Sequence, residues 1–113
     1  MTAVANNWET VCQLDDIAPN TGVCALFNGR QVAIFRLATS DDVFAVDNFD
    51  PFGEANVLSR GLIGSIGGEL VVASPLYKQH FSLTTGTCLE DETVSIDTFP
   101  VRIESGKVQL GKE

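Results

Sequence analysis

Basic residues are scarce and scattered in this chain of 113 residues. Seven Lys and Arg stand against 15 Asp and Glu, which gives a net charge of −8. A nucleic-acid interface needs a concentrated basic face that neutralises phosphates, so we expect no nucleic-acid partner. No apolar run approaches the roughly 20 residues that a membrane-spanning helix needs, and we expect no membrane span. The acidic composition is compatible with electrostatic docking on a basic patch of another protein.

Cysteine and histidine are also sparse. Cys12, Cys24 and Cys88 are odd in number and widely spaced, which argues against a disulfide framework and a structural zinc site. The lone imidazole, His80, has too few companions for a transition-metal site, which normally takes three or four protein ligands. Residues 1–7 lack the basic and long apolar regions of a secretory signal, so we expect a cytoplasmic protein with a disordered tail at 1–6.

Helical periodicity is absent too, because apolar residues nowhere recur at helical spacing over the ten or so positions that a stable helix requires. Short β-branched and aromatic runs take its place. The clearest signal is a tight hairpin, in which runs 23–27 and 31–37 flank Asn28-Gly29. Strands are also expected at 8–12, 43–46, 61–66, 69–73, 81–83, 100–104 and 107–110. The pattern predicts one all-β domain over residues 1–113, an antiparallel β-sandwich or small barrel.

Two long segments between predicted strands carry the functional signal. Residues 48–61 begin with NFDPF and have no regular period, and residues 74–86 begin with SPLY. These segments resemble the two loops that hold the iron–sulfur cluster in Rieske-type ferredoxin domains, where the first loop carries Cys-x-His and the second Cys-Pro-x-His. The resemblance implies the Rieske-like [2Fe-2S] domain fold, with two long cluster-type loops.

The four positions that correspond to cluster ligands read Asp50, Phe52, Ser74 and Tyr77. A Rieske centre requires soft thiolates and imidazole nitrogens, which these side chains cannot replace, so no cofactor or metal is expected here. We expect Asp50 to hydrogen-bond Ser74, or alternatively Tyr77, in place of the link that a cluster would provide. The rings of Phe52 and Tyr77 are expected to pack into the vacated volume.

A more extended similarity connects the chain to the small subunits of bacterial NAD(P)H-dependent assimilatory nitrite reductases. It is carried by residues 21–26, 45–52, 57–63, 72–76 and 88–92. The resemblance implies a cofactor-free accessory subunit that docks on a large catalytic subunit. That large subunit would carry FAD, siroheme and an iron–sulfur cluster, and would reduce nitrite to ammonia in nitrogen assimilation.

Under this hypothesis the loop tips face the partner, because buried aromatic and apolar anchors dominate interface energies. The candidates are Phe49, Phe52, Arg60, Leu76 and Tyr77. The acidic run 90–92 is either a second docking element or a solvated turn. Two alternatives stay open: a Rieske-like ferredoxin that carries electrons, which would need Cys and His at the four ligand positions, and a free-standing protein-interaction module. No catalytic residue is expected in this chain.

Overall fold

The computed structural model describes residues 7–112, and the tail expected at 1–6 lies outside the described residues. The described chain is all-β, as predicted, with two short 3-10 helices. Its elements are β1 (Asn7–Gln13), η1 (Leu14–Asp16), β2 (Thr21–Phe27), β3 (Arg30–Arg36), β4 (Val43–Asp47), β5 (Phe49–Asp50), β6 (Ala55–Asn56), η2 (Leu58–Arg60), β7 (Leu62–Ile66), β8 (Glu69–Ala73), β9 (His80–Ser82), β10 (Thr98–Phe99), β11 (Val101–Glu104) and β12 (Lys107–Lys112).

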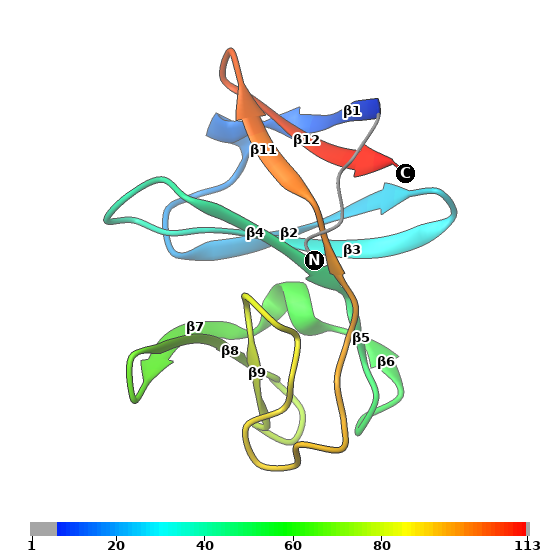
Figure 1. Cartoon of the computed structure of the whole chain (residues 1–113), viewed down its shortest axis with the longest axis vertical. Coiled ribbons are helices and arrows are strands. Elements are labelled where there is room, and N and C mark those ends of the chain that lie inside the picture. The colour runs from blue at the N-terminus through cyan, green and yellow to red at the C-terminus, as the bar shows by residue number, and fades with distance from the viewer. Residues whose placement is uncertain (1–6, 113) are drawn as a thin grey trace.

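The strands form four antiparallel sheets, with the orders β1-β12-β11, β10-β4-β3-β2, β5-β6 and β7-β8-β9. The β10-β4-β3-β2 sheet lies in the middle, with the β1-β12-β11 sheet on one side and the β7-β8-β9 sheet on the other (Figure 1). The first and last strands pair with each other, and the sheets do not join into a closed barrel. None of the helical turns within residues 7–112 is long and apolar enough to cross a membrane.

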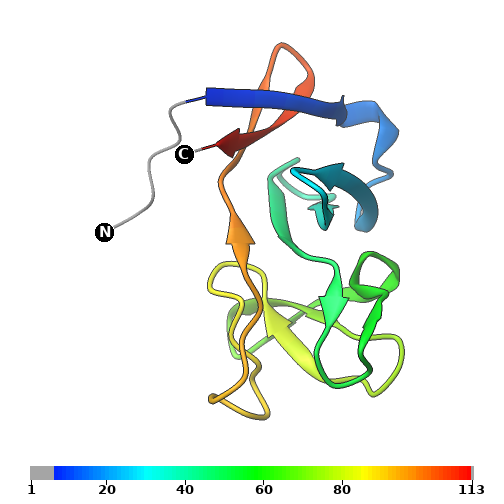
Figure 2. The same cartoon turned by 90° about the vertical axis from the view of Figure 1, so that its right-hand side faces the viewer.

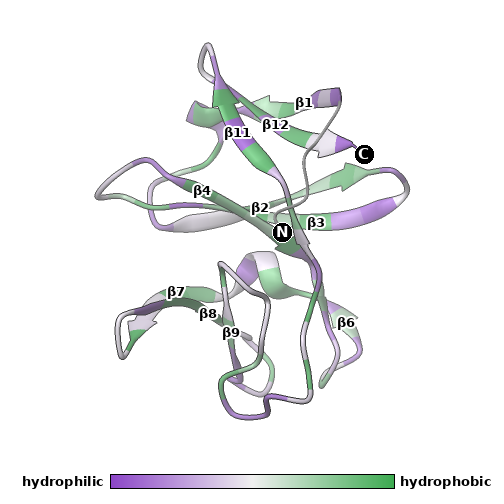
Figure 3. Ribbon diagram, viewed as in Figure 1, coloured by the Kyte–Doolittle hydropathy of each residue, from purple (hydrophilic) through white to green (hydrophobic). Residues whose placement is uncertain are grey.

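The central part of β3, in the middle sheet, is buried on both faces. Val32 and Ile34 of β3 belong to one hydrophobic cluster, which includes Val108 and Leu110 of β12. The alternate residues of β3 point the other way, and Phe35 packs in a second cluster with residues of β8 and β9. Successive side chains of a strand point to opposite faces, so β3 contributes residues to both hydrophobic clusters. This explains why its buried part is a continuous apolar run in the sequence. Figure 3 shows hydrophobic residues running along β4 and β8.

The predicted hairpins are confirmed by their turn geometry. Asn28 and Gly29 join β2 to β3 with φ values of 50° and 76°. Ser105 and Gly106 do the same between β11 and β12, with φ values of 53° and 77°. Positive φ at both central residues matches the twist of the flanking strands, which is why these turns could be located from sequence.

Two features of the sheet pattern were not predicted. Residues 48–61 contain the two-residue strands β5 and β6 as well as η2, where only an irregular loop was expected. The second unexpected element is β10, in which Thr98 and Phe99 pair with Val46 and Ala45 of β4. Strands of two residues are too short to produce an alternating sequence pattern, so their pairing depends on the surrounding fold.

The topology brings the two cluster-type loops to the same end of the molecule. The first loop follows β4 and contains the β5-β6 hairpin, and the second joins β8 to β9. Both lie at the end opposite to β1, β11 and β12 (Figure 1), and the view turned by 90° agrees (Figure 2). The middle sheet and the β7-β8-β9 sheet thus position the candidate site.

Gly29 and Gly86 have similar backbone angles but different surroundings. Replacing each by Ala therefore distinguishes the loss of stability caused by positive φ from the loss caused by crowding. Gly29 has φ +76° and open space where a Cβ would lie, whereas at Gly86, with φ +80°, that atom would lie 2.1 Å from the Ile96 carbonyl oxygen. We expect Gly29→Ala to lower the free energy of unfolding by about 1–2 kcal/mol, the cost of the left-handed conformation. Gly86→Ala should lower the free energy of unfolding by about 1–3 kcal/mol more than Gly29→Ala, because the added methyl group would force the Ile96 backbone to move. Urea denaturation of the two variants measures these free energies, and equal losses of stability would contradict the prediction.

Candidate functional site at the two long loops

The first loop, residues 48–61 (loop 1), is anchored by a buried asparagine. The Asn48 backbone N–H donates to the Gln31 carbonyl at 3.0 Å, and its side-chain amide donates to Gln31 Oε1 at 3.1 Å. At the far end of the loop, Asn48 Oδ1 accepts the Ser59 N–H at 2.7 Å, and its carbonyl accepts the Leu58 N–H at 3.0 Å. One residue therefore ties both ends of loop 1 to β3, so the base of the loop is fixed on the middle sheet.

The second loop, residues 74–79 between β8 and β9 (loop 2), is closed by its own backbone. The Ser74 N–H donates to the Gln79 carbonyl at 2.9 Å, and the Ser74 carbonyl accepts the Lys78 N–H at 3.1 Å. Lys78 takes the left-handed conformation, with φ 63°, that this tight return requires. The Ser74 hydroxyl also accepts the Leu76 N–H at 3.2 Å, so loop 2 is a compact turn.

A buried hydrogen bond joins the two loops. The Ser74 hydroxyl donates to Asp50 Oδ2, and the other carboxylate oxygen, Oδ1, accepts the Phe52 N–H at 2.9 Å. Both Asp50 and Ser74 are buried. Of the two partners expected for Asp50, the structure forms the bond with Ser74, and that prediction is confirmed. The side chains that replace two cluster ligands therefore bind each other.

The two aromatic replacements behave differently. Phe52 is half-buried against the core below loop 1, with its ring centroid 6.1 Å from that of Phe81, so its expected packing is confirmed. Tyr77 is 64% exposed, and the prediction that it also packs into the vacated volume is wrong. Leu76 lies between the loops instead, so close to loop 1 that a Cβ at Gly53 would be 2.4 Å from its Cδ1. This leaves the Tyr77 ring outside.

The donor atoms at the loops do not fit a [2Fe-2S] cluster. A carboxylate and a hydroxyl that bind each other, a phenyl ring and an exposed phenol take the place of two thiolates and two imidazoles. Burial is the main cause that raises the pKa of Cys12, Cys24 and Cys88, and a thiol is a poor ligand compared with a thiolate. Across residues 7–112, no three His, Cys, Asp or Glu side chains are grouped so that they could hold a metal ion.

Apolar side chains project from the joined loops. Phe49, Leu76 and Tyr77 are 39%, 47% and 64% exposed, and Arg60 is exposed at the end of η2. Exposed apolar residues clustered at one end of a molecule indicate an interaction site more than scattered ones do. Four of the five candidates for contact with a partner are therefore exposed, whereas Phe52 is half-buried and packs against the core.

A hydrogen-bonded contact that the sequence did not indicate holds the acidic run against the start of β9, directly after loop 2. Glu90 Oε2 lies 2.6 Å from His80 Nδ1, and Glu90 Oε1 accepts the His80 N–H at 2.7 Å. Burial raises the pKa of Glu90, but the bonds from the His80 backbone and imidazole outweigh it, and the pKa is lowered overall. No motif links a His to a Glu ten residues away, so only the fold reveals this pair.

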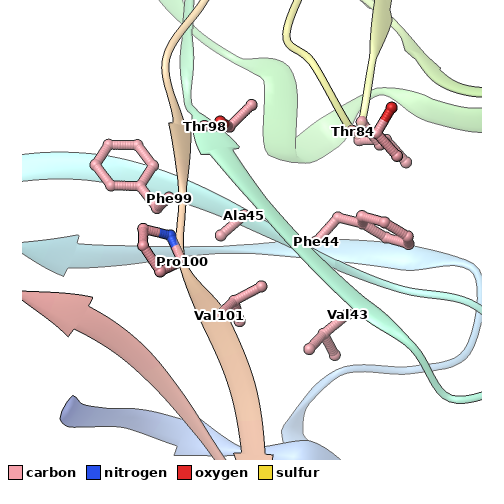
Figure 4. Close-up of a pocket in the computed structure, with 9 residues that line it drawn as sticks. Val43, Phe44, Ala45, Thr84, Thr98, Phe99, Pro100 and Val101 are labelled. Atoms are coloured by element: carbon pink, nitrogen blue, oxygen red, sulfur yellow. The ribbon is translucent and has the colours of Figure 1, made fainter. Parts of the chain in front are cut away.

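A separate cavity of about 410 Å³ lies away from the loops, between β4 and the β10-β11 segment (Figure 4). Apolar side chains such as Phe44, Phe99 and Val101 line it, together with the hydroxyls of Thr84 and Thr98. None of the residues that line it is titratable, so its lining supplies no general acid or base.

Comparison with known proteins places these observations in context. The sequence model of the "Rieske-like [2Fe-2S] domain" family matches residues 7–111. The nitrite reductase (NADH) small subunit of Salmonella typhimurium is 57% identical over 105 residues, which cover 93% of this chain and 97% of that protein. The NMR structure of the Escherichia coli protein NirD has a TM-score of 0.86 and 55% identity, covering 94% of this chain and 96% of that one. A segment 44% identical over 106 residues covers 94% of this chain and forms 11% of the nitrite reductase [NAD(P)H] large subunit of Klebsiella oxytoca.

The bond between the loops can be tested by its contribution to stability. Ser74→Ala leaves the buried Asp50 carboxylate without its hydroxyl donor, and we expect the free energy of unfolding to fall by about 1.5–3 kcal/mol, as for hydrogen bonds to charged groups. Ser65→Ala, on the exposed strand β7, is the matched control and should change it by less than about 0.5 kcal/mol. Chemical denaturation of both variants gives the comparison, and equal stabilities would show that the bond is not what joins the loops.

Proposed function

Because the chain belongs to the Rieske-like [2Fe-2S] domain family and, within it, to the nitrite reductase (NADH) small subunits, we propose that it is an accessory subunit of an NAD(P)H-dependent nitrite reductase. It carries no cofactor of its own and docks on the large catalytic subunit. By resemblance, that subunit holds FAD, siroheme and an iron–sulfur cluster and reduces nitrite to ammonia in nitrogen assimilation. The complex works in the cytoplasm.

The observation that carries the proposal is the fused relative. In the large subunit from Klebsiella oxytoca, a segment 44% identical to this chain is part of the same polypeptide. Covalent linkage holds two domains at a high effective concentration, which allows a specific contact between them to persist. A separate chain of the same fold would need to make that contact by docking, which favours the large subunit as its partner.

The loops are suited to docking because they are already rigid. Loop 1 is tied to β3 through Asn48, loop 2 is closed by its own backbone, and the bond between Ser74 and Asp50 joins them. A pre-organised surface loses less conformational entropy on binding than a flexible one. The exposed Phe49, Leu76 and Tyr77 would supply the apolar anchors of the interface.

Electron transfer by this chain is not favoured. A Rieske-like ferredoxin needs thiolate and imidazole ligands, and the loops offer a carboxylate, a hydroxyl, a phenyl ring and a phenol. Support for the large subunit therefore comes through contact, for example by ordering it or by limiting solvent access to its reaction site. The third possibility, an interaction module with an unrelated partner, is separated by experiment.

The test is to remove the chain and add it back. We expect NADH-dependent nitrite reduction by the large subunit to fall when this chain is deleted and to recover when the purified chain is added. The purified chain should contain far less than one iron atom per molecule. Unchanged nitrite reduction would favour an unrelated partner, and stoichiometric iron with visible absorption would favour an electron carrier.

A single aromatic side chain tests the docking surface. Tyr77→Ala should weaken association with the large subunit by about 30-fold, corresponding to the roughly 2 kcal/mol typical of an interface hot spot. Its melting temperature should hardly change, because the ring is 64% exposed. Leu26→Ala, which removes a 71% exposed apolar side chain from β2, is the control and should leave association unchanged. Surface plasmon resonance measures both, and equal effects would place the interface elsewhere.

A further inference from the structure

A cavity of about 340 Å³ opens between the end of loop 1 and loop 2. Arg60 reaches it from the end of η2, and Lys78 reaches it from the tight return of loop 2. Leu62 of β7 and Pro75 provide apolar walls, and His80 also lines the cavity. We call it the cationic pocket, because no Asp or Glu is among the residues that line it.

Among the described residues, the positive charges of this pocket have no counterion. Four of the other five cations are neutralised or stacked: Arg30 by Asp47 and Asp97, Arg36 by Asp41, Lys112 by Glu9, and Arg102 over the ring of Trp8. The fifth, Lys107, forms no ion pair within residues 7–112 and does not share a pocket with another cation. Over the described range 7–112, neither Arg60 nor Lys78 forms an ion pair. Two carboxylates contact residues that line the pocket, and both are already engaged. The Glu90 oxygens bind the His80 N–H and imidazole, and the Asp50 oxygens accept the Ser74 hydroxyl and the Phe52 N–H.

Two uncompensated cations in one pocket are unusual for a chain with a net charge of −8. A guanidinium group recognises a carboxylate through paired hydrogen bonds, and an ammonium group adds a point charge. Leu62 is 78% exposed, so the pocket also has an apolar rim that a partner surface would remove from water. The apolar rim favours a side chain carried by a protein over a small free anion, which would leave Leu62 in water.

We propose that the cationic pocket binds an acidic side chain of the large subunit, held between Arg60 and Lys78 while an adjacent apolar group covers Leu62. The inference rests on the proposed function and adds the chemistry of the contact. It also extends the docking surface from the tips of the loops to the edge strand β7, where Ile66 is a further exposed apolar residue.

Charge reversal in the full chain tests the pocket, with binding to the purified large subunit as the readout. Arg60→Glu and Lys78→Glu should each weaken binding about tenfold at low salt, mostly by slowing association, and the loss should shrink as salt rises. Lys107→Glu is the matched control, because it changes the net charge equally at the exposed first residue of β12, a strand at the opposite end of the molecule (Figure 1). It should change binding less than about twofold. Melting temperatures confirm that all variants are folded.

The outcomes separate this inference from the proposed function. If the wild-type chain does not bind the large subunit, the proposed function itself fails. If the wild type binds and both pocket variants resemble Lys107→Glu, the function stands and the pocket has no role in docking. Normal association with a raised KM for nitrite would assign the pocket to a free anion, and the proposal would be overturned. An acidic-to-Lys change in the large subunit that restores binding of Lys78→Glu would support it directly.

Discussion

Burial of β3 on both faces is the constraint on which the rest of the structure depends. Val32 and Ile34 belong to the core shared with β12, and Ala33 and Phe35 belong to the core shared with β8 and β9. A shift of one residue in its register would exchange these two sets, so both outer sheets are fixed relative to the same strand. The neighbouring strand β4 is fixed in the same way and continues directly into loop 1. The position of the candidate site therefore follows from the packing of the middle sheet.

The joined loops show how a cluster-type frame persists when its donor atoms do not fit a cluster. One hydrogen bond to a carboxylate contributes only about 1.5–3 kcal/mol, much less than a covalently ligated metal centre would. The frame depends in addition on backbone bonds within loop 2 and on the bonds of Asn48, which tie loop 1 to β3. Many modest interactions thus hold the shape, and the surface that results is rigid without a metal. Rigidity is what recognition of a partner needs, whereas electron transfer needs the missing ligands.

The elements that sequence could predict are those specified locally. The Asn28-Gly29 turn predicts its hairpin because positive φ at both residues is a property of the two residues themselves. The contact between Asp50 and Ser74 was predictable because the loop resemblance places both at ligand positions that converge. Three features could not be predicted from the sequence: the pairing of β10 with β4, the contact between His80 and Glu90, and the exposure of Tyr77. Each depends on segments that are brought together only in the fold. The same holds for the shared cavity of Arg60 and Lys78, which lie 18 residues apart in the chain.

The contrast between an acidic chain and a cationic pocket bears on specificity. With a net charge of −8, most of the surface repels an acidic partner, so an acidic group that approaches is accepted only where uncompensated cations lie. Screening limits this effect to roughly 8 Å at physiological salt, so it acts on orientation during the final approach. The two bonds from His80 to Glu90 matter for the same reason, because a free carboxylate beside the pocket could pair with Lys78 or Arg60 and compete with the partner. By holding Glu90 in place, the fold keeps both cations available for recognition.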